Sequence, residues 1–240
     1  MPPTFFSLLQ HLRPQPELPE PMQHVETGEP CSDHEYVSTI HPEDPSLHRT
    51  ADATVTLTVL ELMRYTLEYP SELPTAPDDF LVPDVIRDVV TSAEAAGGFS
   101  AIALSEHPAP SLKWRRNGGH DTLDPVAALS FMAAVTTDIK LMTNLFVLPF
   151  RNPYLSAKAL STLDILSAGR LIAGVGAGYL RSEFAALGVN VDDRARLLDE
   201  ALAALRSIWT EPERPFSGTG FTATSPMWLQ PPVQRPHPPI

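Results

Sequence analysis

Hydrophobic and polar residues alternate along two stretches near residue 60, a pattern that is typical of half-buried strands. The run Ala-Thr-Val-Thr-Leu-Thr-Val-Leu at residues 53–60 alternates in this way, and so does Met-Arg-Tyr-Thr-Leu-Glu-Tyr at residues 63–69. The period changes to that of a helix at residues 83–96, between Pro83 near its start and Gly97, which ends it. The apolar stripe of this helix consists of Val85, Ile86, Val89 and Val90.

Short apolar strands and amphipathic helices alternate along the rest of the chain. The expected strands cover residues 99–104, 139–148 and 171–175, and the expected helices cover 125–136, 153–166 and 194–209. Two of these helices begin with a capping side chain followed by a proline, at Asp124-Pro125 and Asn152-Pro153. We expect a long loop at 109–123, a small hairpin at 216–222 and an extended tail at 226–240. The order of elements predicts an α/β fold with a parallel sheet. It fits the first half of a (β/α)8 barrel and also a doubly wound sheet.

The first 62 residues differ in composition from the rest. Residues 1–50 are rich in Pro, Glu, His and Ser and show no sustained period. Such a segment buries too little apolar surface to offset the entropy lost on ordering. We therefore expect residues 1–62 to be a disordered Pro-rich extension and residues 63–240 to be the folded domain. A structured cap on the domain is the alternative.

Composition and charge exclude several classes of protein. The 240 residues are 43% apolar, which is enough for one sizeable core, and the formal net charge is −12. That charge argues against nucleic acid or an anionic membrane as partner. Cys31 is the one cysteine, so no disulfide framework exists, and no apolar run approaches the roughly 20 residues of a membrane span. We expect a cytoplasmic protein that acts on a small molecule.

A glycine loop, Gly174-Val-Gly-Ala-Gly-Tyr, follows the expected strand at 171–175. A dinucleotide fingerprint needs glycine at positions one, three and six, but position six is Tyr179 or Arg181 in the two possible registers. The loop therefore does not favour a nicotinamide site. Its backbone N–H groups and the start of the next helix could still hold a phosphate, and a tight turn without a ligand is the alternative.

Polar residues stand just past one expected strand and inside another. His107 lies in Ser105-Glu106-His107-Pro108, just past the strand at 99–104, where it could transfer protons or hydrogen-bond a cofactor ring. Packing within the loop is the alternative for this histidine. Thr143 and Asn144 interrupt the apolar strand at 139–148, so they need partners, either a ligand at the mouth of a barrel or neighbouring backbone. The loop at 109–123 is either a lid or a solvated loop.

Several longer motifs resemble one protein family. These motifs are Leu-Pro-Phe-Arg-Asn-Pro at 148–153 and the runs at 157–171 and 174–189. They resemble the bacterial-luciferase-like monooxygenases. Ser-Glu-His-Pro at 105–108 and Asn-Gly-Gly-His-Asp at 117–121 are similar to the branch that uses the deazaflavin coenzyme F-420. The tail at 232–240 is similar to the segment that precedes the fifth barrel strand in this family.

The resemblance implies a luciferase-like, TIM-type (β/α)8 barrel that binds coenzyme F-420 or, alternatively, FMN. It implies a catalytic role for His107, in contact with the cofactor ring. Thr143 and Asn144 would back the ring. The residues expected near the cofactor's phosphate region are Gly176, Ala177, Gly178 and Tyr179.

The resemblance also implies that the barrel is truncated after about four β/α units. It covers residues 63–240 and stops where the fifth strand would begin. An open sheet edge would favour association, either as a homo-oligomer or with another chain.

Three functional hypotheses follow. The first is an oxidoreductase that either moves a hydride between the deazaflavin and a small organic substrate or oxygenates that substrate with reduced FMN and oxygen. The second is a fragment of such an enzyme that is inactive or depends on association. The third and weaker one is a nicotinamide-binding domain.

Overall fold

The computed structural model describes residues 65–240, except 74, 75 and 77. The strand expected at 53–60 and the extension expected at 1–62 lie outside these residues. The division of the chain near residue 62 therefore stays a prediction.

Four parallel strands form the main sheet. Their order is β1 (Tyr65–Glu68), β2 (Phe99–Leu104), β3 (Lys140–Thr143) and β5 (Leu171–Ile172). Because each strand pairs with the next strand of this series in parallel, the chain must return through a crossover connection, and each crossover here contains a helix. The parallel α/β fold predicted from the sequence is confirmed.

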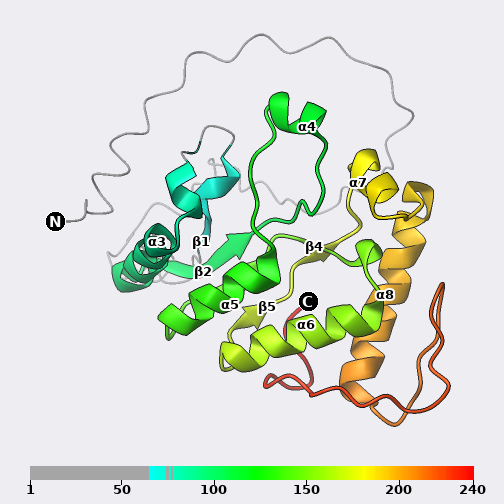
Figure 1. The fold of residues 1–240 in the computed structure, drawn as a ribbon. Coiled ribbons are helices and arrows are strands. Elements are labelled where there is room, and N and C mark those ends of the chain that lie inside the picture. The colour runs from blue at the N-terminus through cyan, green and yellow to red at the C-terminus, as the bar shows by residue number, and fades with distance from the viewer. Residues whose placement is uncertain (1–64, 74–75, 77) are drawn as a thin grey trace, which may run out of the picture. The chain divides into compact units, whose positions relative to one another are not determined.

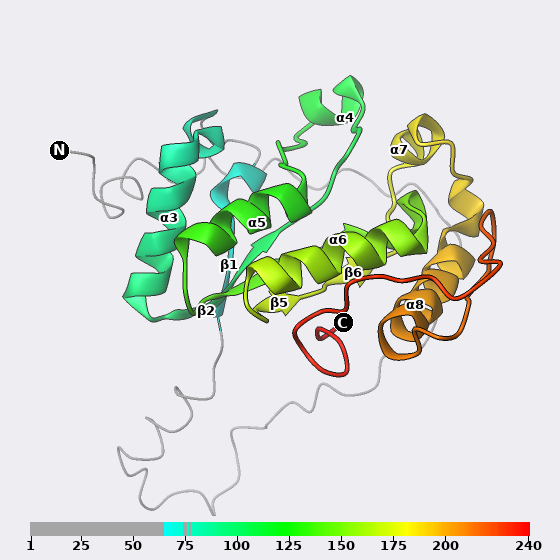
Figure 2. The same ribbon diagram turned by 60° about the horizontal axis from the view of Figure 1, so that its bottom comes forward.

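The three crossover helices line one face of the sheet, side by side (Figures 1 and 2). They are α3 (Pro83–Ala96), α5 (Pro125–Val135) and α6 (Pro153–Leu166). The two predicted caps are confirmed, since Asp124 accepts a hydrogen bond from the N–H of Ala127 and Asn152 accepts one from the N–H of Tyr154, each at 2.9 Å. None of the helices in the described part of the chain is long and apolar enough to cross a membrane.

The strand expected at 139–148 is divided into two. β4 (Phe146–Val147) follows β3 after the Asn144–Leu145 peptide bond, which is cis, and pairs with β6 (Val175–Gly176) in a second parallel sheet. Between the two sheets, the Thr143 hydroxyl donates to the carbonyl of Gly174 at 2.7 Å. The strand expected at 171–175 is divided as well: β5 ends at Ile172 and β6 begins at Val175.

Short elements complete the described part of the chain. The loop expected at 109–123 contains α4 (Leu112–Arg116), which is too short to show a helical period in the sequence. α7 (Arg181–Ala186) follows the glycine loop, and α8 (Arg194–Thr210) confirms the expected amphipathic helix. The expected hairpin at 216–222 is reduced to one antiparallel bridge between Gly218 and Phe221. The 3-10 turns are Pro70–Glu72, Asp78–Leu81, Leu148–Phe150 and Val191–Asp193.

The core lies between the sheet and its helices. Each large apolar side chain buried there contributes roughly 1.5–3 kcal/mol. α8 packs beside α6, where the Trp209 indole N–H donates to the Ser161 hydroxyl at 2.8 Å. Fully buried aliphatic side chains include Val90, Ile102, Leu104, Leu129, Met132, Leu141, Leu148, Leu160, Leu163, Leu171 and Leu205.

One buried carboxylate holds the tail. Asp164 near the end of α6 accepts hydrogen bonds from the backbone N–H of Val233 at 2.7 Å and of Gln234 at 2.9 Å, and from the Gln234 side-chain amide at 2.7 Å. The tail then runs on to β5, where the carbonyl of Pro239 accepts from the N–H of Ala173 at 2.8 Å. The end of the chain accordingly lies near β5 (Figure 1). The predicted extended tail is thus fixed by donors that converge on Asp164.

Replacing Asp164 with alanine leaves three donors without their acceptor. We expect the Asp164→Ala variant to lose about 2–4 kcal/mol of unfolding free energy, because unpaired buried donors cost about 1–3 kcal/mol each and water compensates part of the loss. Urea unfolding measures the loss, and Asp199→Ala on the exposed side of α8 is the control. Equal stability of the Asp164 variant and the parent would show that the tail is not held through this carboxylate.

Candidate functional site

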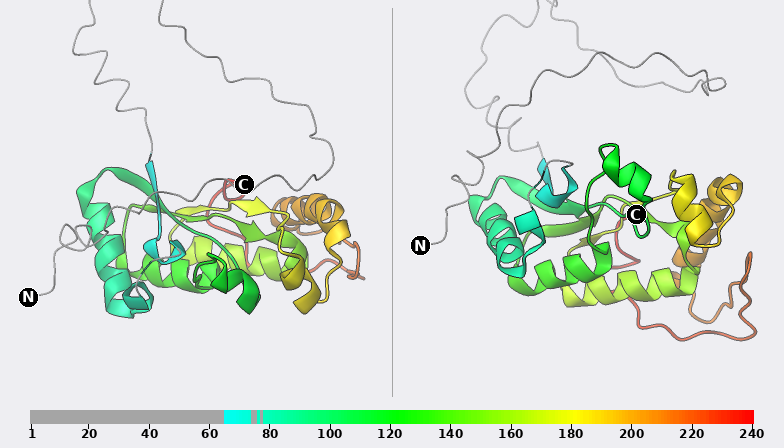
Figure 3. Two further views of the ribbon diagram at one scale, coloured as in Figure 1. Left: turned by 90° about the horizontal axis from the view of Figure 1, so that it is seen from above. Right: turned by 45° about the horizontal axis from the view of Figure 1, so that its top comes forward.

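The predicted site residues meet at one end of the sheet. The last residue of β2, Leu104, pairs with Thr143 in β3, and Val147 in β4 pairs with Gly176 in β6. The segments that follow these strands therefore emerge together. α4 and α7 stand at this same end (Figure 3). The ring of His107, after β2, lies 5.9 Å from that of Tyr179, after β6.

Three aromatic rings surround His107. The ring centroid of Trp114 lies 4.5 Å from that of His107, His120 lies 5.4 Å away, and Tyr179 is almost perpendicular to it. Trp114 and His120 come from the loop at 109–123, so this loop covers the imidazole instead of standing free in solvent. Only 9% of the His107 side chain is exposed. Burial, and secondarily the proximity of His107, lower the pKa of His120 below its usual value.

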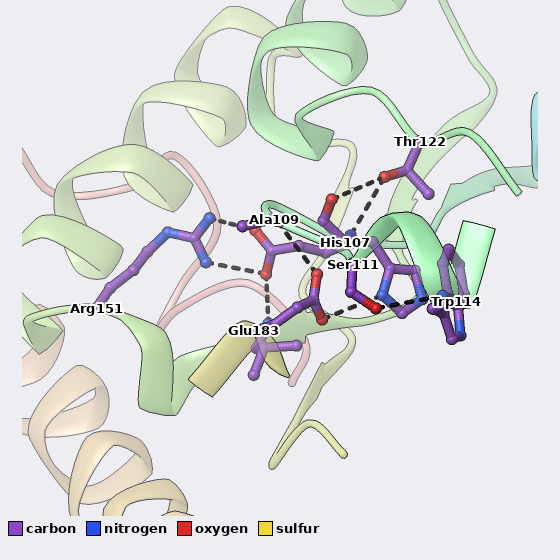
Figure 4. A network of polar contacts seen from close by, with 9 residues as sticks. His107, Ala109, Ser111, Trp114, Thr122, Arg151 and Glu183 are labelled. Atoms are coloured by element: carbon purple, nitrogen blue, oxygen red, sulfur yellow. Dashed lines mark hydrogen bonds and ion pairs between the residues drawn. The ribbon is translucent and has the colours of Figure 1, made fainter. Parts of the chain in front are cut away.

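Glu183 of α7 reaches the other side of His107 (Figure 4). Its Oε2 lies 3.2 Å from Nδ1 of His107, and its Oε1 accepts a hydrogen bond from the N–H of Ala109 at 3.2 Å. The Glu183 side chain is 3% exposed. Sequence reasoning missed this residue. The sequence signal was the apolar Phe184 that follows it, which the structure shows to be buried.

The neighbour of His107, Glu106, makes an ion pair with Arg151. Its Oε2 accepts hydrogen bonds from the N–H of Val147 at 2.7 Å and from Nη1 of Arg151 at 2.9 Å. Nη2 of Arg151 donates to Oε1 of the same carboxylate, and the guanidinium lies over the Phe146 ring at 4.1 Å. A buried carboxylate with this many donors is well satisfied. Glu106 therefore fixes the backbone of His107 relative to β4.

Thr143 and Asn144 have different surroundings. The Thr143 side chain is buried and its hydroxyl has a backbone partner at Gly174. The Asn144 residue is exposed at the mouth, while its backbone N–H donates to the carbonyl of Leu104 at 2.6 Å. The contact of either residue with a cofactor ring stays a prediction. Asn144 is the better placed for such a contact, because it is exposed whereas Thr143 is buried.

Close packing alone explains why glycines occupy positions 176 and 178 of the loop. A Cβ at Gly176 would lie 2.6 Å from a methyl group of Leu145, and a Cβ at Gly178 would lie 2.7 Å from one of Val147. Gly178 also has a φ of +73°, which side chains rarely adopt. Ala177 is half-buried and Tyr179 is 64% exposed. The phosphate contact of this loop stays a prediction, and a Gly178→Val variant does not test it, because the variant would disturb the loop itself.

A buried acid lies beside the strand end that carries His107. Glu72, in the turn after β1, accepts a hydrogen bond from the backbone N–H of Ser105. Burial raises its pKa to about 8, and the nearby Glu68 adds to this effect. No group of three or more His, Cys, Asp or Glu residues in the described part of the chain could hold a metal ion.

Comparison with known proteins gives one family. The family described as "Luciferase-like monooxygenase" matches residues 64–240. An F420-dependent glucose-6-phosphate dehydrogenase from Gordonia bronchialis is 34% identical over 143 residues, which are 55% of this chain and 40% of the relative. An FMNH(2)-dependent dimethylsulfone monooxygenase from Pseudomonas putida is 31% identical over 126 residues, 51% of this chain and 34% of the relative.

The fold is also similar to solved structures. The monooxygenase RslO1 from Streptomyces bottropensis superimposes with a TM-score of 0.63 and 27% identity, over 73% of this chain and 52% of that one. The likeness confirms the luciferase-like barrel fold predicted from the sequence, for the part of the barrel that the chain spans. The chain spans from about a third to about half of the length of these proteins.

The raised pKa of Glu72 predicts how stability depends on pH. The folded protein keeps this proton up to about pH 8, whereas the unfolded chain loses it near 4.5, so stability falls as pH rises between these values. A glutamine at this position carries no charge. We therefore expect Glu72→Gln to be more stable than the parent at pH 8, by on the order of 2 kcal/mol, and to match it near pH 4.5.

Urea unfolding of both proteins at several pH values measures this difference. Glu213→Gln, at an exposed position, serves as the control and should keep the pH dependence of the parent. A Glu72→Gln variant with the same pH slope as the parent would contradict the assignment.

Proposed function

Because the chain belongs to the luciferase-like monooxygenase family, we propose that it takes part in the oxidation or reduction of a small organic substrate with coenzyme F-420 as cofactor. The observation that carries the proposal is His107, a nearly buried imidazole at the carboxyl end of β2. It is held by a carboxylate and surrounded by aromatic rings. Such an imidazole can orient a ring and move a proton at it.

The residues at the site fit a flavin-type group. Nδ1 of His120 is buried and has no hydrogen-bond partner in the described part of the chain. Exposed Tyr179 and Asn144 would contact the ring from two other strand ends, and the glycine loop at 174–178 would lie near the phosphate. The cofactor, when bound, supplies the hydride or oxygen chemistry. The chain itself would bind and orient the ring, exclude water with Trp114, and hold a proton at His107.

Coenzyme F-420 is proposed before FMN because of the motifs at 105–108 and 117–121, which are similar to the deazaflavin branch. A relative named as F420-dependent supports this order, and one named as FMNH(2)-dependent keeps FMN as the alternative. The glycine spacing disfavours NAD. The chain spans about half of RslO1 and less than half of the other two proteins. We therefore also propose that it associates through an open sheet edge, and that its activity depends on this association.

The proposal is tested by binding and turnover. The chain is titrated with F-420, FMN and NADH while fluorescence is followed. We expect saturable binding of F-420, or of FMN, and none of NADH. Saturation by NADH, or no binding of either flavin-type cofactor, would count against the proposal.

The role of His107 is tested with an alanine variant. We expect His107→Ala to lower turnover roughly 10²–10⁴-fold, because a positioned acid or base is removed, while cofactor affinity changes much less. The first assays use glucose 6-phosphate with F-420, and dimethylsulfone and oxygen with reduced FMN. His237→Ala, at a histidine of the tail beside Trp209, is the control. Full turnover of His107→Ala would remove His107 from the mechanism.

A further inference from the structure

We propose that Glu183 is a positioning residue that keeps the proton of neutral His107 on Nδ1 and leaves Nε2 as the nitrogen that meets a ligand. The inference rests on the proposed function only for the nature of that ligand. The two side chains come from segments 76 residues apart, after β2 and after β6, and meet at 3.2 Å. Both are almost fully buried, so water does not compete for the nitrogen.

The chemistry of the pair assigns the proton. An ionised carboxylate accepts hydrogen bonds and does not donate them. Oε1 of Glu183 already accepts the N–H of Ala109, and Oε2 faces Nδ1 of His107. A neutral imidazole carries one proton, so the nitrogen that faces the carboxylate is the protonated one. The hydrogen bond that one ring nitrogen makes thereby decides the state of the other.

The second nitrogen is free for another partner. Nε2 of His107 makes no hydrogen bond within the described part of the chain, and it is not among the buried atoms that lack a partner. The rings of Trp114, His120 and Tyr179 lie around the imidazole, so a ligand that reaches this nitrogen does so between them. In the assigned tautomer Nε2 accepts a proton or a hydrogen bond.

The fold holds Glu183 in place for this contact. Its neighbour Phe184 is buried, and the Phe184 ring packs against Phe150 with centroids 4.8 Å apart. The backbone of Glu183 also accepts a hydrogen bond from the N–H of Leu187 at 2.9 Å. The contact between Phe184 and Phe150 therefore fixes α7. The carboxylate of Glu183 projects toward His107 (Figure 4).

A purely structural role for Glu183 would be to tie the loop at 109–123 to α7 through Ala109. The Glu183→Gln substitution separates the two roles. The amide oxygen of a glutamine can still accept the N–H of Ala109, whereas its NH₂ group would face Nδ1 and donate to it. The variant should keep the tie and move the imidazole proton to Nε2.

The test is the tautomer of His107 in the full chain, read from ¹⁵N chemical shifts and ring ¹H–¹⁵N couplings of histidine-labelled protein under mildly alkaline conditions. The signal of His107 is identified by its loss in His107→Asn. We expect a protonated Nδ1 and an unprotonated Nε2 in the parent, and the reverse in Glu183→Gln at nearly parental thermal stability. The other charged or titratable groups that face this ring, His120 and Tyr179, are the same in both proteins.

Glu200→Gln is the matched control, because Glu200 likewise accepts one backbone N–H and one side-chain partner, both from Thr219. It should leave the His107 signals unchanged. A parent in which His107 carries its proton on Nε2 overturns the proposal and needs no variant, even if Glu183→Gln fails to fold. A folded Glu183→Gln with the parental tautomer overturns it as well. Since no cofactor is present, failure of the proposed function would leave this result unaffected.

Discussion

The site depends on the contact between the Glu106 carboxylate and the chain that follows the break in the third strand. After the break, Phe146 and Val147 pair in a second sheet, so their remaining backbone groups need partners outside the first ladder. Glu106 supplies one, at the N–H of Val147, and Arg151 neutralises its charge. Removing one partner from a buried ion pair costs about 3–5 kcal/mol. This contact thus fixes the end of β2 against β4.

Two consecutive residues that follow β2, Glu106 and His107, have different roles. Glu106 reaches toward β4 and fixes the backbone, while His107 turns to Glu183 and the aromatic rings. One carboxylate sets where the imidazole stands, and the other sets which of its nitrogens carries the proton. The chemistry proposed for the site, ring contact and proton transfer, follows from this division.

Much of the fold could be predicted from the sequence because its signals are local. The apolar periodicity and the terminal Pro83 and Gly97 predict α3, and the short apolar run after it predicts β2. The Asp-Pro and Asn-Pro pairs predict the starts of α5 and α6. The position of His107 at one end of the sheet could be predicted because it lies three residues after the end of β2. The divided strand could not be predicted, since residues 139–148 are apolar on both sides of the break. Asp164 and Glu183 were missed because their partners lie about 70 residues or more away along the chain, where no periodic pattern connects them.

The contact between Glu106 and β4 is tested most directly by hydrogen exchange at the Val147 amide in the parent and in Glu106→Ala, which removes the acceptor. A charged hydrogen bond is worth about 1.5–3 kcal/mol, and each 1.4 kcal/mol is tenfold in the local opening equilibrium. We predict a protected Val147 amide in the parent and exchange roughly 10–100-fold faster in the variant, with a change in the His107 ring signals. Unchanged protection of Val147 together with unchanged His107 signals would contradict it.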